Sequence, residues 1–391
     1  MAQVPQGTDL STILNSIKAT ASNAYQETVP FATADTITDV GTAVLNAPSA
    51  IQNEFMQNLY NKIGLTLVDY PVVTNPLGFL KKGTLEYGQT IEDLYVGLAT
   101  AEPYVTGMNN GEYPDPFVIR KVPHRSAFYS AILSRQYQVT RHLTDLKKAF
   151  HGSASLEAFI GGILNAMTSR EQYDDYRMTV ALLARQIEEA ATMDPVDGHT
   201  HAGRVQLITG FNETVEAEEQ VDMSNAFQSK AFLQYFSNQL KKWSSRLGYL
   251  RSDLNIAGVE NILPKESQRI MMPGDILVDF ETTLLAWAYN NQLLEIGGVD
   301  EIDTWYSIGA GAEDGEGVVL TPDDIEIKSQ VADGLNVMAV IYDPGMLKIY
   351  NKEHISSTQE NAKGNYWNLF QSVEDIYAAN PYRNFVYFTL D

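Results

Sequence analysis

A pair of histidines comes nearest to a metal site in this sequence. His199 and His201 alternate, so on a strand both imidazoles would point to the same face. Asp194 and Asp197 lie close enough to add carboxylate oxygens, as in zinc sites with mixed ligands. The glycine-rich surroundings favour a loop, however, and no further ligand stands at a defined spacing. We therefore expect no bound metal.

An acidic, glycine-rich segment is the second candidate for chemistry. Residues 309–317 read GAGAEDGEG, which suggests either a phosphate cradle or a calcium loop. The segment lacks the Gly-Lys-Ser/Thr ending of a phosphate-binding loop, and its carboxylates would repel phosphate. It also lacks the alternating ligands and final glutamate of a calcium-binding hand. We expect a solvated loop instead.

Catalytic groups are otherwise hard to single out. Carboxylate pairs such as Glu216 and Glu218 would suit glycoside hydrolysis, but a pair chosen among 49 acidic residues carries little weight. The serine-nucleophile elbow and the zinc-protease motif do not occur in the sequence. Without cysteine, the chain has no disulfide, thiol nucleophile or cysteine-bound zinc. The sequence therefore predicts neither an enzyme nor a cofactor.

Charge and hydropathy limit the kinds of partner that the chain can bind. Its 49 acidic residues outnumber 27 lysines and arginines, and the net charge of −22 disfavours nucleic-acid binding. A negative charge of this size can keep a protein soluble, or it can prevent DNA from binding to the inner wall of a container. Composition alone does not distinguish these two explanations. Acidic residues interrupt the most apolar stretch, 276–296, so we expect no membrane span. The first residues do not resemble a signal peptide, and we expect folding in the cytosol.

The elements that would position these residues begin with an arm. Residues 1–50 predict one helix over 9–23 and little apolar surface besides, so the arm should pack along something else. A second helix is expected over 49–62. From 64 to 139, short strand patterns separated by Gly, Pro and Asn predict an extended two-stranded excursion.

The strongest local pattern predicts one long helix over residues 155–193. Ser155 is suited to cap its start, apolar residues recur at helical spacing, and Asp194-Pro195 ends it. At 1.5 Å per residue, the helix would span roughly 55–60 Å. Its charged residues exclude a membrane span, so we interpret it as a structural spine.

The rest of the chain mixes helices with strands, which predicts an α+β fold. Over 203–335 we expect a helix at 224–249, a strand at 276–280 and a helix at 282–295. Residues 337–390 are rich in strand-forming types. The 21 tyrosines combine apolar area with a polar group, which suits either a core or a protein interface.

This order of elements resembles the Hong Kong 97-type capsid fold of tailed phages. Three blocks are also similar to the major capsid proteins of picovirus-type podoviruses, which are short-tailed bacteriophages. The blocks are FATADTITDVGTAVLNAPSAIQNEFMQNLYNKIGL (31–65), NPLGFLKKGTLEYGQTIEDLY (75–95) and NYWNLFQSVEDIYAANPYRNFVYFT (365–389). The order of elements matches over nearly the whole chain, whereas the similarity of letters covers a much smaller part of it.

The resemblance implies a division into capsid domains. An N-terminal arm would occupy residues 1–50, an E-loop 76–136 and an axial (A) domain 203–335. The peripheral (P) domain, which includes the spine helix 155–193, would combine residues 51–75, 137–202 and 336–391.

The resemblance also implies a function. Copies of the chain would form homopentamers and homohexamers around their A-domain tips and build an icosahedral head, the virion capsid, in the host bacterial cytoplasm. The head would enclose double-stranded DNA without reading its sequence, with a portal protein and a scaffolding protein as further partners. Some relatives append an immunoglobulin-like domain after the last sheet; because this chain stops at Asp391, we expect none.

Two other functions stay open on the sequence alone. An encapsulin-type nanocompartment shares the fold but encloses cargo proteins, so the nucleic acid in purified particles separates it from a phage head. A carbohydrate-binding or carbohydrate-hydrolysing protein would suit the acidic, tyrosine-rich composition. Sedimentation separates such a protein from a giant shell.

The residues expected to join neighbouring subunits carry charges. The E-loop has a basic bias on an otherwise acidic chain, and the spine helix carries carboxylates. We expect the E-loop to lie over a neighbour's spine helix, where these charges pair. Exposed pairs contribute only about 0–1 kcal/mol each, so they would set register more than strength. The cations are Lys81, Lys82, Arg120, Lys121 and Arg125, and the carboxylates are Glu171, Asp174 and Asp175.

Overall fold

A computed structural model places most of the chain in two compact units. It describes residues 10–33, 36–63, 73–85, 90–101, 117, 119–129, 132–142, 153–193, 201–285, 298–308, 312–314, 317–320, 325–328, 331 and 335–391. Unit 1 combines Met1–Asn75, Ser134–Tyr176 and Asn351–Glu374. Unit 2 combines Pro76–Leu133, Arg177–Tyr350 and Asp375–Asp391. Both units are therefore built from segments that are far apart in the sequence.

Unit 1 begins with four helices that pack around one apolar core. They are α1 (Leu10–Thr20), α2 (Asn23–Thr28), α3 (Ile37–Asn46) and α4 (Ser49–Ile63). The hydroxyl of Ser22 caps α2 by accepting a hydrogen bond from the backbone N–H of Tyr25. The core contains buried side chains from all four helices and from a distant strand, among them Ile17, Tyr25, Val40, Phe55 and Trp367.

This core shows what the N-terminal arm, which has too little apolar surface to fold alone, packs along: α1, α2 and α3 share it with α4 and with Trp367 of a distant strand. Each helix alone offers only a short apolar stripe. Together the helices remove side chains such as Ile17 and Phe55 completely from solvent, and burial of each such side chain contributes about 1.5–3 kcal/mol.

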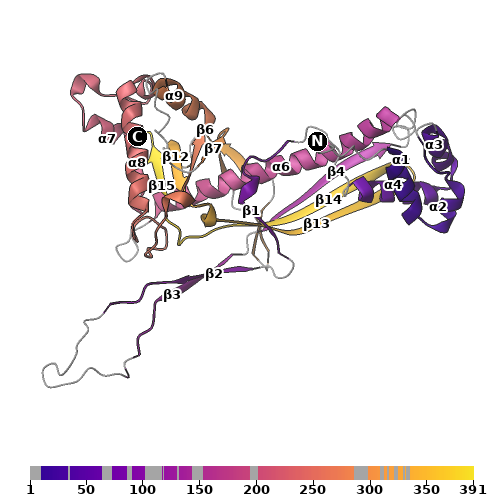
Figure 1. Cartoon of the computed structure of the whole chain (residues 1–391), viewed down its shortest axis with the longest axis horizontal. Coiled ribbons are helices and arrows are strands. Elements are labelled where there is room, and N and C mark those ends of the chain that lie inside the picture. Colours follow the sequence, from indigo (N-terminus) through magenta and orange to yellow (C-terminus); the bar gives the residue numbers. More distant parts are fainter. Residues whose placement is uncertain are drawn as a thin grey trace, which may run out of the picture. The chain divides into compact units, whose positions relative to one another are not determined.

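The predicted long helix is confirmed. It is α6 (Ser153–Thr192), an unbroken helix of 40 residues that runs as one magenta ribbon in Figure 1. Every side chain from 178 to 184 is buried. A helix that is buried on all sides is enclosed by protein, so this stretch is an interior element rather than a surface helix with one apolar stripe.

A six-stranded sheet has the order β1-β13-β14-β4-β10-β9. Its longest strands are β13 (Leu347–Asn361) and β14 (Tyr366–Ala379), drawn beside β4 in Figure 1. The turn between them includes Asn365 at φ 51°, a left-handed conformation that asparagine tolerates. The other strands are β1 (Lys81–Thr84), β4 (Ile132–His142), β9 (Ala312–Asp314) and β10 (Gly317–Leu320).

A five-stranded sheet forms the core of unit 2, with the order β5-β15-β12-β6-β7. Three helices pack with it (Figure 1), and the rings of Phe236 and Phe388 lie 5.8 Å apart between helix and sheet. The strands are β5 (Arg204–Gln206), β6 (Arg269–Pro273), β7 (Val299–Ile302), β12 (Val337–Tyr342) and β15 (Val386–Thr389). The helices are α7 (Leu207–Asn212), α8 (Lys230–Leu247) and α9 (Gly274–Leu285).

This sheet contains strands from both sides of the predicted boundary between the A domain (203–335) and the last segment of the P domain (336–391). Its strands β5, β6 and β7 come from the predicted A segment, whereas β12 and β15 come from the predicted P segment. Hydrogen-bonded strands on both sides of that division form one sheet, so it does not separate two independent cores.

One predicted helix and one predicted strand differ from the structure. The helix expected from 224 begins at Lys230, because Asp222 first accepts hydrogen bonds from Ser224 and Asn225 and Ser229 then caps α8. The strand expected at 276–280 is wrong, since those residues lie in α9 and the strand β6 comes before them. Of the helix expected at 282–295, residues 286–295 lie outside the described residues.

Two short antiparallel strand pairs complete unit 2. The strands β2 (Ile91–Val96) and β3 (His124–Tyr129) pair as the sequence predicts for the excursion, and we call this pair the ribbon. The second pair is β8 (Trp305–Ile308) with β11 (Ile325–Lys328). Within the described part of the chain, no helix combines the length and apolarity that crossing a bilayer requires.

Candidate functional site

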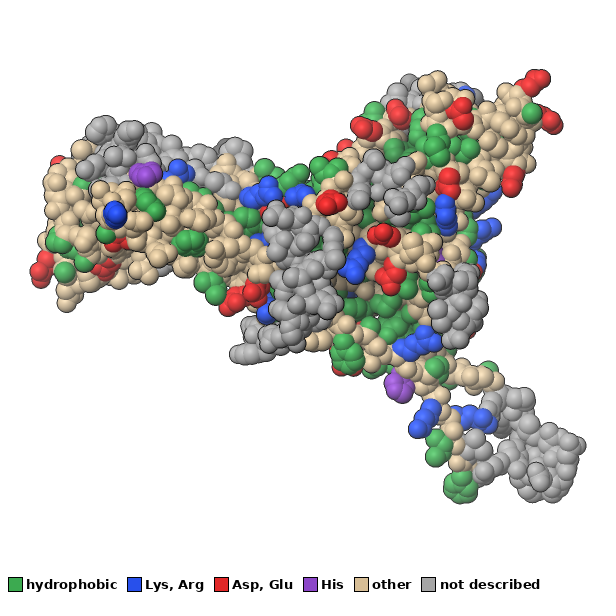
Figure 2. Space-filling view, turned by 180° about the vertical axis from the view of Figure 1, so that it is seen from behind, with side chains coloured by type: hydrophobic (Ala, Val, Ile, Leu, Met, Phe, Trp, Pro, Cys, Tyr) green, Lys and Arg blue, Asp and Glu red, His purple; other side chains and the backbone are tan. Residues whose placement is uncertain are grey.

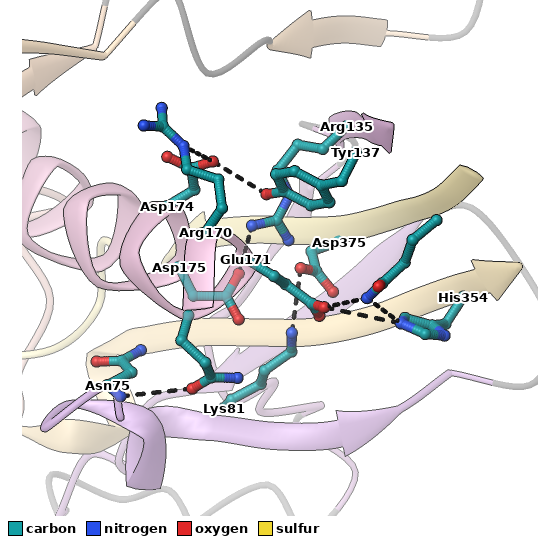
Figure 3. Close-up of polar contacts among 12 residues, drawn as sticks. Asn75, Lys81, Arg135, Tyr137, Arg170, Glu171, Asp174, Asp175, His354 and Asp375 are labelled. Carbon is teal, nitrogen blue, oxygen red and sulfur yellow. Dashed lines mark hydrogen bonds and ion pairs between the residues drawn. The ribbon is translucent and has the colours of Figure 1, made fainter. Parts of the chain in front are cut away.

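A polar network lines the side of α6 that faces β4 in unit 1. The guanidinium group of Arg135 donates to the carboxylate of Asp175 at 2.6 Å, with both side chains buried. Asp174 accepts from the hydroxyl of Tyr137 and from the guanidinium of Arg170, each at 3.0 Å. Figure 3 shows these groups converging from the helix and the strand. Burial, with the nearby carboxylate of Asp174, raises the pKa of Tyr137 well above its usual value.

The third spine carboxylate, Glu171, has its own partners on the sheet. It accepts a hydrogen bond from the amide of Gln371 at 2.5 Å. The ring of His354 lies 2.9 Å from the same amide and 3.7 Å from Glu171 (Figure 3). Glu171 is buried. All three carboxylates expected to meet a neighbour therefore have partners within their own chain.

Two of the predicted cations are also bound within the chain. The ammonium group of Lys81 lies 3.1 Å from the buried carboxylate of Asp375, and Arg125 donates to the carbonyl of Ala257 at 2.6 Å. The side chain of Lys82 is exposed, but neighbouring atoms displace part of the water around its ammonium group. This loss of hydration, together with the charge of Lys348, lowers the pKa of Lys82. Lys81 thus serves the fold of its own subunit, and Lys82 is the more accessible of the two lysines.

One face of the ribbon is tied to the rest of unit 2 by polar contacts. Asp93 lies 3.2 Å from the ammonium of Lys348 and accepts from the amide of Asn380 at 2.7 Å. The hydroxyl of Tyr95 donates to the carbonyl of Glu260 at 2.7 Å. Asp93, Tyr95 and Arg125 share this face, because residues directly opposite across the ladder point the same way.

The opposite face of the ribbon is exposed, and apolar side chains lie on it beside Glu92, Ser126 and His124. Leu94, Val96 and Phe128 have exposed fractions of 61%, 59% and 65%, and the register places them on one side. Leu98 and Val122 continue the same stripe and are exposed as well. We call these five side chains the apolar stripe. A soluble ribbon normally turns its apolar side inward, so the arrangement is the reverse of what a lone subunit requires.

The remaining predicted cations lie beyond the end of the ribbon. Arg120 and Lys121 are both exposed, in the segment that leads into β3. The structure does not bring them to the spine carboxylates, which are enclosed by other partners. No pattern of charge along the sequence distinguishes a carboxylate enclosed in this way from a solvated one. The apolar stripe was missed by the sequence analysis, although the alternation of Leu94, Val96 and Leu98 with polar residues was a usable signal.

The candidates for chemistry do not assemble into a reactive site. Within the described residues, no three His, Asp or Glu side chains gather as a metal site requires. His201 is buried with its ring centroid 4.5 Å from that of Phe385, while His199 and most of the 309–317 loop lie outside the described residues. Glu216 and Glu218 are exposed on a loop.

Two surface pockets are lined by groups with structural ties. One of about 390 Å³ lies over strands of unit 1 and is lined in part by Arg135, which is bound to Asp175. The other, of about 340 Å³, is lined in part by Arg269, which donates to Asp300 at 2.8 Å. Asp300 also accepts from the hydroxyl of Tyr342 at 2.7 Å. One arginine at each pocket is thus held by a fixed carboxylate, which favours a structural role for it.

Comparison with known proteins matches nearly the whole chain to one family. Residues 14–389 match the family described as Phi29-like phage major capsid protein. The major capsid protein of Bacillus phage PZA is 24% identical over 380 residues, covering 96% of this chain and 72% of the relative. That of Bacillus phage B103 is 22% identical over 378 residues, with the same coverage of 96% and 72%.

A solved structure supports the same fold. A chain in the capsid structure of Staphylococcus phage Andhra has a TM-score of 0.56 at 12% identity, and the match covers 83% of this chain and 87% of that one. The α+β capsid fold of tailed phages predicted from the order of elements is confirmed by this likeness.

Proposed function

The chain belongs to the Phi29-like phage major capsid protein family, and from this premise we propose how its copies join into a shell. As a major capsid protein it is a structural component of the virion, forms the icosahedral head and is no enzyme. Family membership thereby selects the phage head over the nanocompartment and the carbohydrate-active protein that the sequence left open.

We propose that the parts of the subunit correspond to those of the capsid fold. The helix α6 is the spine, the ribbon lies in the E-loop (76–136), and α8 belongs to the A domain (203–335). Copies join as pentamers and hexamers around the A-domain tips, since rings close when a head-to-tail contact repeats. A portal protein and a scaffolding protein assist, and the shell encloses double-stranded DNA that its net charge of −22 helps to keep from adhering.

The observation that carries this proposal is the apolar stripe of the ribbon. Large exposed apolar surfaces on soluble proteins mark interaction sites, and the polar face of this ribbon is already used within its own subunit. A neighbouring subunit that covers the apolar stripe removes Leu94, Val96 and Phe128 from water. Each side chain fully buried in this way contributes about 1.5–3 kcal/mol.

Charged contacts supplement the apolar stripe in this proposal. Of the predicted cations, Lys82 and Lys121 are exposed and carry this part of the proposal. Arg120 is exposed as well, but it also interacts within its own chain. Lys81 and Arg125 hold their own subunit together. Because Glu171, Asp174 and Asp175 are buried, the carboxylates that these cations meet on a neighbour are ones exposed on its surface.

The test replaces Leu94 and Val96 together by aspartate in the phage that carries this chain. We expect full-length subunits but few or no heads when lysates are sedimented and imaged by electron microscopy. The matched control, Leu94→Met with Val96→Ile, keeps the stripe apolar and should give heads at the parental yield. Heads at normal yield from the aspartate variant would rule out burial of the stripe between subunits.

A further inference from the structure

The last turns of α8 carry a patch that combines basic and apolar side chains. Lys241, Lys242 and Arg246 are exposed there. Just beyond the helix, Tyr249, Leu250 and Ile262 have exposed fractions of 68%, 48% and 44%. An antiparallel bridge between the backbones of residues 251 and 261 brings Leu250 and Ile262 to the same place. We call these six residues the α8 end patch.

An acidic loop lies between α7 and α8. Residues 213–220 include Glu213, Glu216, Glu218 and Glu219, all exposed. The neck of this loop is fixed by Asn212, whose side chain donates to the carbonyl of Val221 and accepts from its N–H, both at 2.9 Å. These two bonds hold the two ends of the acidic loop together, and Val221 at one end is buried.

The acidic loop and the α8 end patch lie at different levels along α8. Phe211, at the base of the loop, packs against Phe232 and Tyr235, with ring centroids 5.6 Å apart in both pairs. Arg246 follows 11 residues after Tyr235, roughly 17 Å further along the helix at 1.5 Å per residue. Figure 2 shows acidic side chains at the upper right edge and basic ones lower on that edge.

Both sets of charges lie on exposed side chains. Among the described residues, Lys241, Lys242 and Arg246 form no ion pair, and neither do the four glutamates of the acidic loop. The guanidinium of Arg246 lies over the ring of Trp243, 4.7 Å from its centroid. Stacking on an aromatic ring holds a guanidinium in one orientation and leaves its edge free to donate.

We propose that the acidic loop of one subunit docks on the α8 end patch of the next, so that head-to-tail copies close into the capsomer ring. The inference rests on the proposed function and names the two surfaces that meet within a ring. The occupant is a second copy because one chain carries both complementary surfaces and they form no ion pair with each other. A contact between two different surfaces of identical subunits is the kind that generates closed rings.

A simpler role for the basic residues makes a different prediction. Lysine and arginine near the carboxyl end of a helix offset the helix dipole within one subunit. That role involves neither the acidic loop nor the exposed Tyr249, Leu250 and Ile262. It predicts that reversing the charges of the acidic loop cannot compensate for reversing those of the patch.

The test is a charge swap in the phage that carries this chain, read as the yield of sedimenting heads. Lys241→Glu with Lys242→Glu should lower the yield about tenfold or more, since like charges facing each other across an interface cost several kcal/mol. Glu218→Lys with Glu219→Lys should do the same. The chain with all four substitutions should return to near the parental yield, because the two surfaces are complementary again.

The control for net charge uses another adjacent pair of exposed glutamates. Glu188 and Glu189 lie on α6, and their replacement by lysine in the Lys241→Glu, Lys242→Glu chain restores the net charge without restoring the contact. We expect no rescue from that combination. Equal rescue by both combinations, or no rescue by the acidic-loop swap, would overturn the inference. If the parental virions lacked this chain in their heads, the proposed function itself would fail.

Discussion

Removing the guanidinium of Arg135 should be among the most damaging single changes within a subunit. The side chains of Arg135 and Asp175 have exposed fractions of 0% and 5%, and they meet at 2.6 Å. Replacing Arg135 by methionine keeps most of the apolar length of the side chain but leaves the carboxylate buried with its cation removed. Breaking a buried ion pair from one side costs about 3–5 kcal/mol.

The surroundings of the pair place the expected cost toward the upper end of that range. Asp174, the next residue along α6, is completely buried as well and is bound to Tyr137 and Arg170. Without Arg135, Asp175 loses the cation that it meets at 2.6 Å, next to a second buried carboxylate. Like charges in an interior of low dielectric repel strongly, so the loss includes this repulsion.

The assay is thermal and urea unfolding of the purified subunit. A loss of 3–5 kcal/mol corresponds to a fall in Tm of roughly 6–20 °C at about 2–4 °C per kcal/mol.

A double substitution separates the charge from the packing. Replacing both partners, Arg135→Met with Asp175→Leu, should restore most of the stability, since apolar groups of similar volume often replace a buried pair at little cost. If Arg135→Met lowered stability by less than 1 kcal/mol at pH 7, or if the double variant lost the sum of the single losses, the electrostatic reasoning would be wrong.

Three further predictions concern two buried tyrosines, a glycine in an unusual backbone conformation, and an exposed charge of the E-loop. Burial, with the carboxylate of Asp300, raises the pKa of Tyr342 well above its usual value, and burial raises that of Tyr387 to about 12. The folded state thus favours the neutral phenols, so the stability they contribute should be lost as the pH rises above about 10; absorbance at 295 nm should show neither residue ionising at the usual pH. Gly83→Val should lower the free energy of unfolding by about 1–3 kcal/mol, because φ is +116° at this residue and side chains disfavour that backbone conformation. No other atom lies within 4 Å of the added Cβ, so the loss is backbone strain rather than a clash. An unchanged urea midpoint would contradict this. Lys121→Glu should leave subunit unfolding unchanged while slowing head assembly measured by light scattering; a normal assembly rate would remove this cation from the interface.

The elements that depend on local pattern could be predicted from the sequence. The long apolar repeat of α6 and the strand patterns of the ribbon follow from periodicity within one segment. The N-terminal core could not be predicted in this way, because its apolar residues lie on four short helices and on β14. Trp367, for example, donates its indole N–H to Asn53, 314 positions earlier in the chain.

The contacts that the site residues make within the subunit could not be predicted either, for the same reason. Carboxylates on a helix look solvated in a sequence, and only the fold brings Arg135 to Asp175 from a strand 40 positions away. The apolar run at 276–280 predicts a strand, yet the preceding β6 is the segment that pairs in the sheet, and 276–280 lie in α9. Tertiary pairing therefore overrode local preference in each case.

Burial and exposure together separate the contacts that make a subunit from those that join subunits. The buried ion pairs at Asp175 and Asp375 are complete within one chain, so they should form when the subunit folds and respond little to salt. In the proposed shell, a neighbouring copy covers the apolar stripe. This contact should weaken on cooling, because burial of apolar surface contributes less free energy at low temperature. The contact of the acidic loop with the α8 end patch is exposed and charged. Salt should therefore weaken it, because dissolved ions screen exposed charges from each other. Capsomer rings should therefore loosen at high salt before the subunits unfold, and the ribbon contacts should loosen first on cooling. Rings that resisted high salt but dispersed in the cold would mean that apolar contacts, rather than the charged loop, close them.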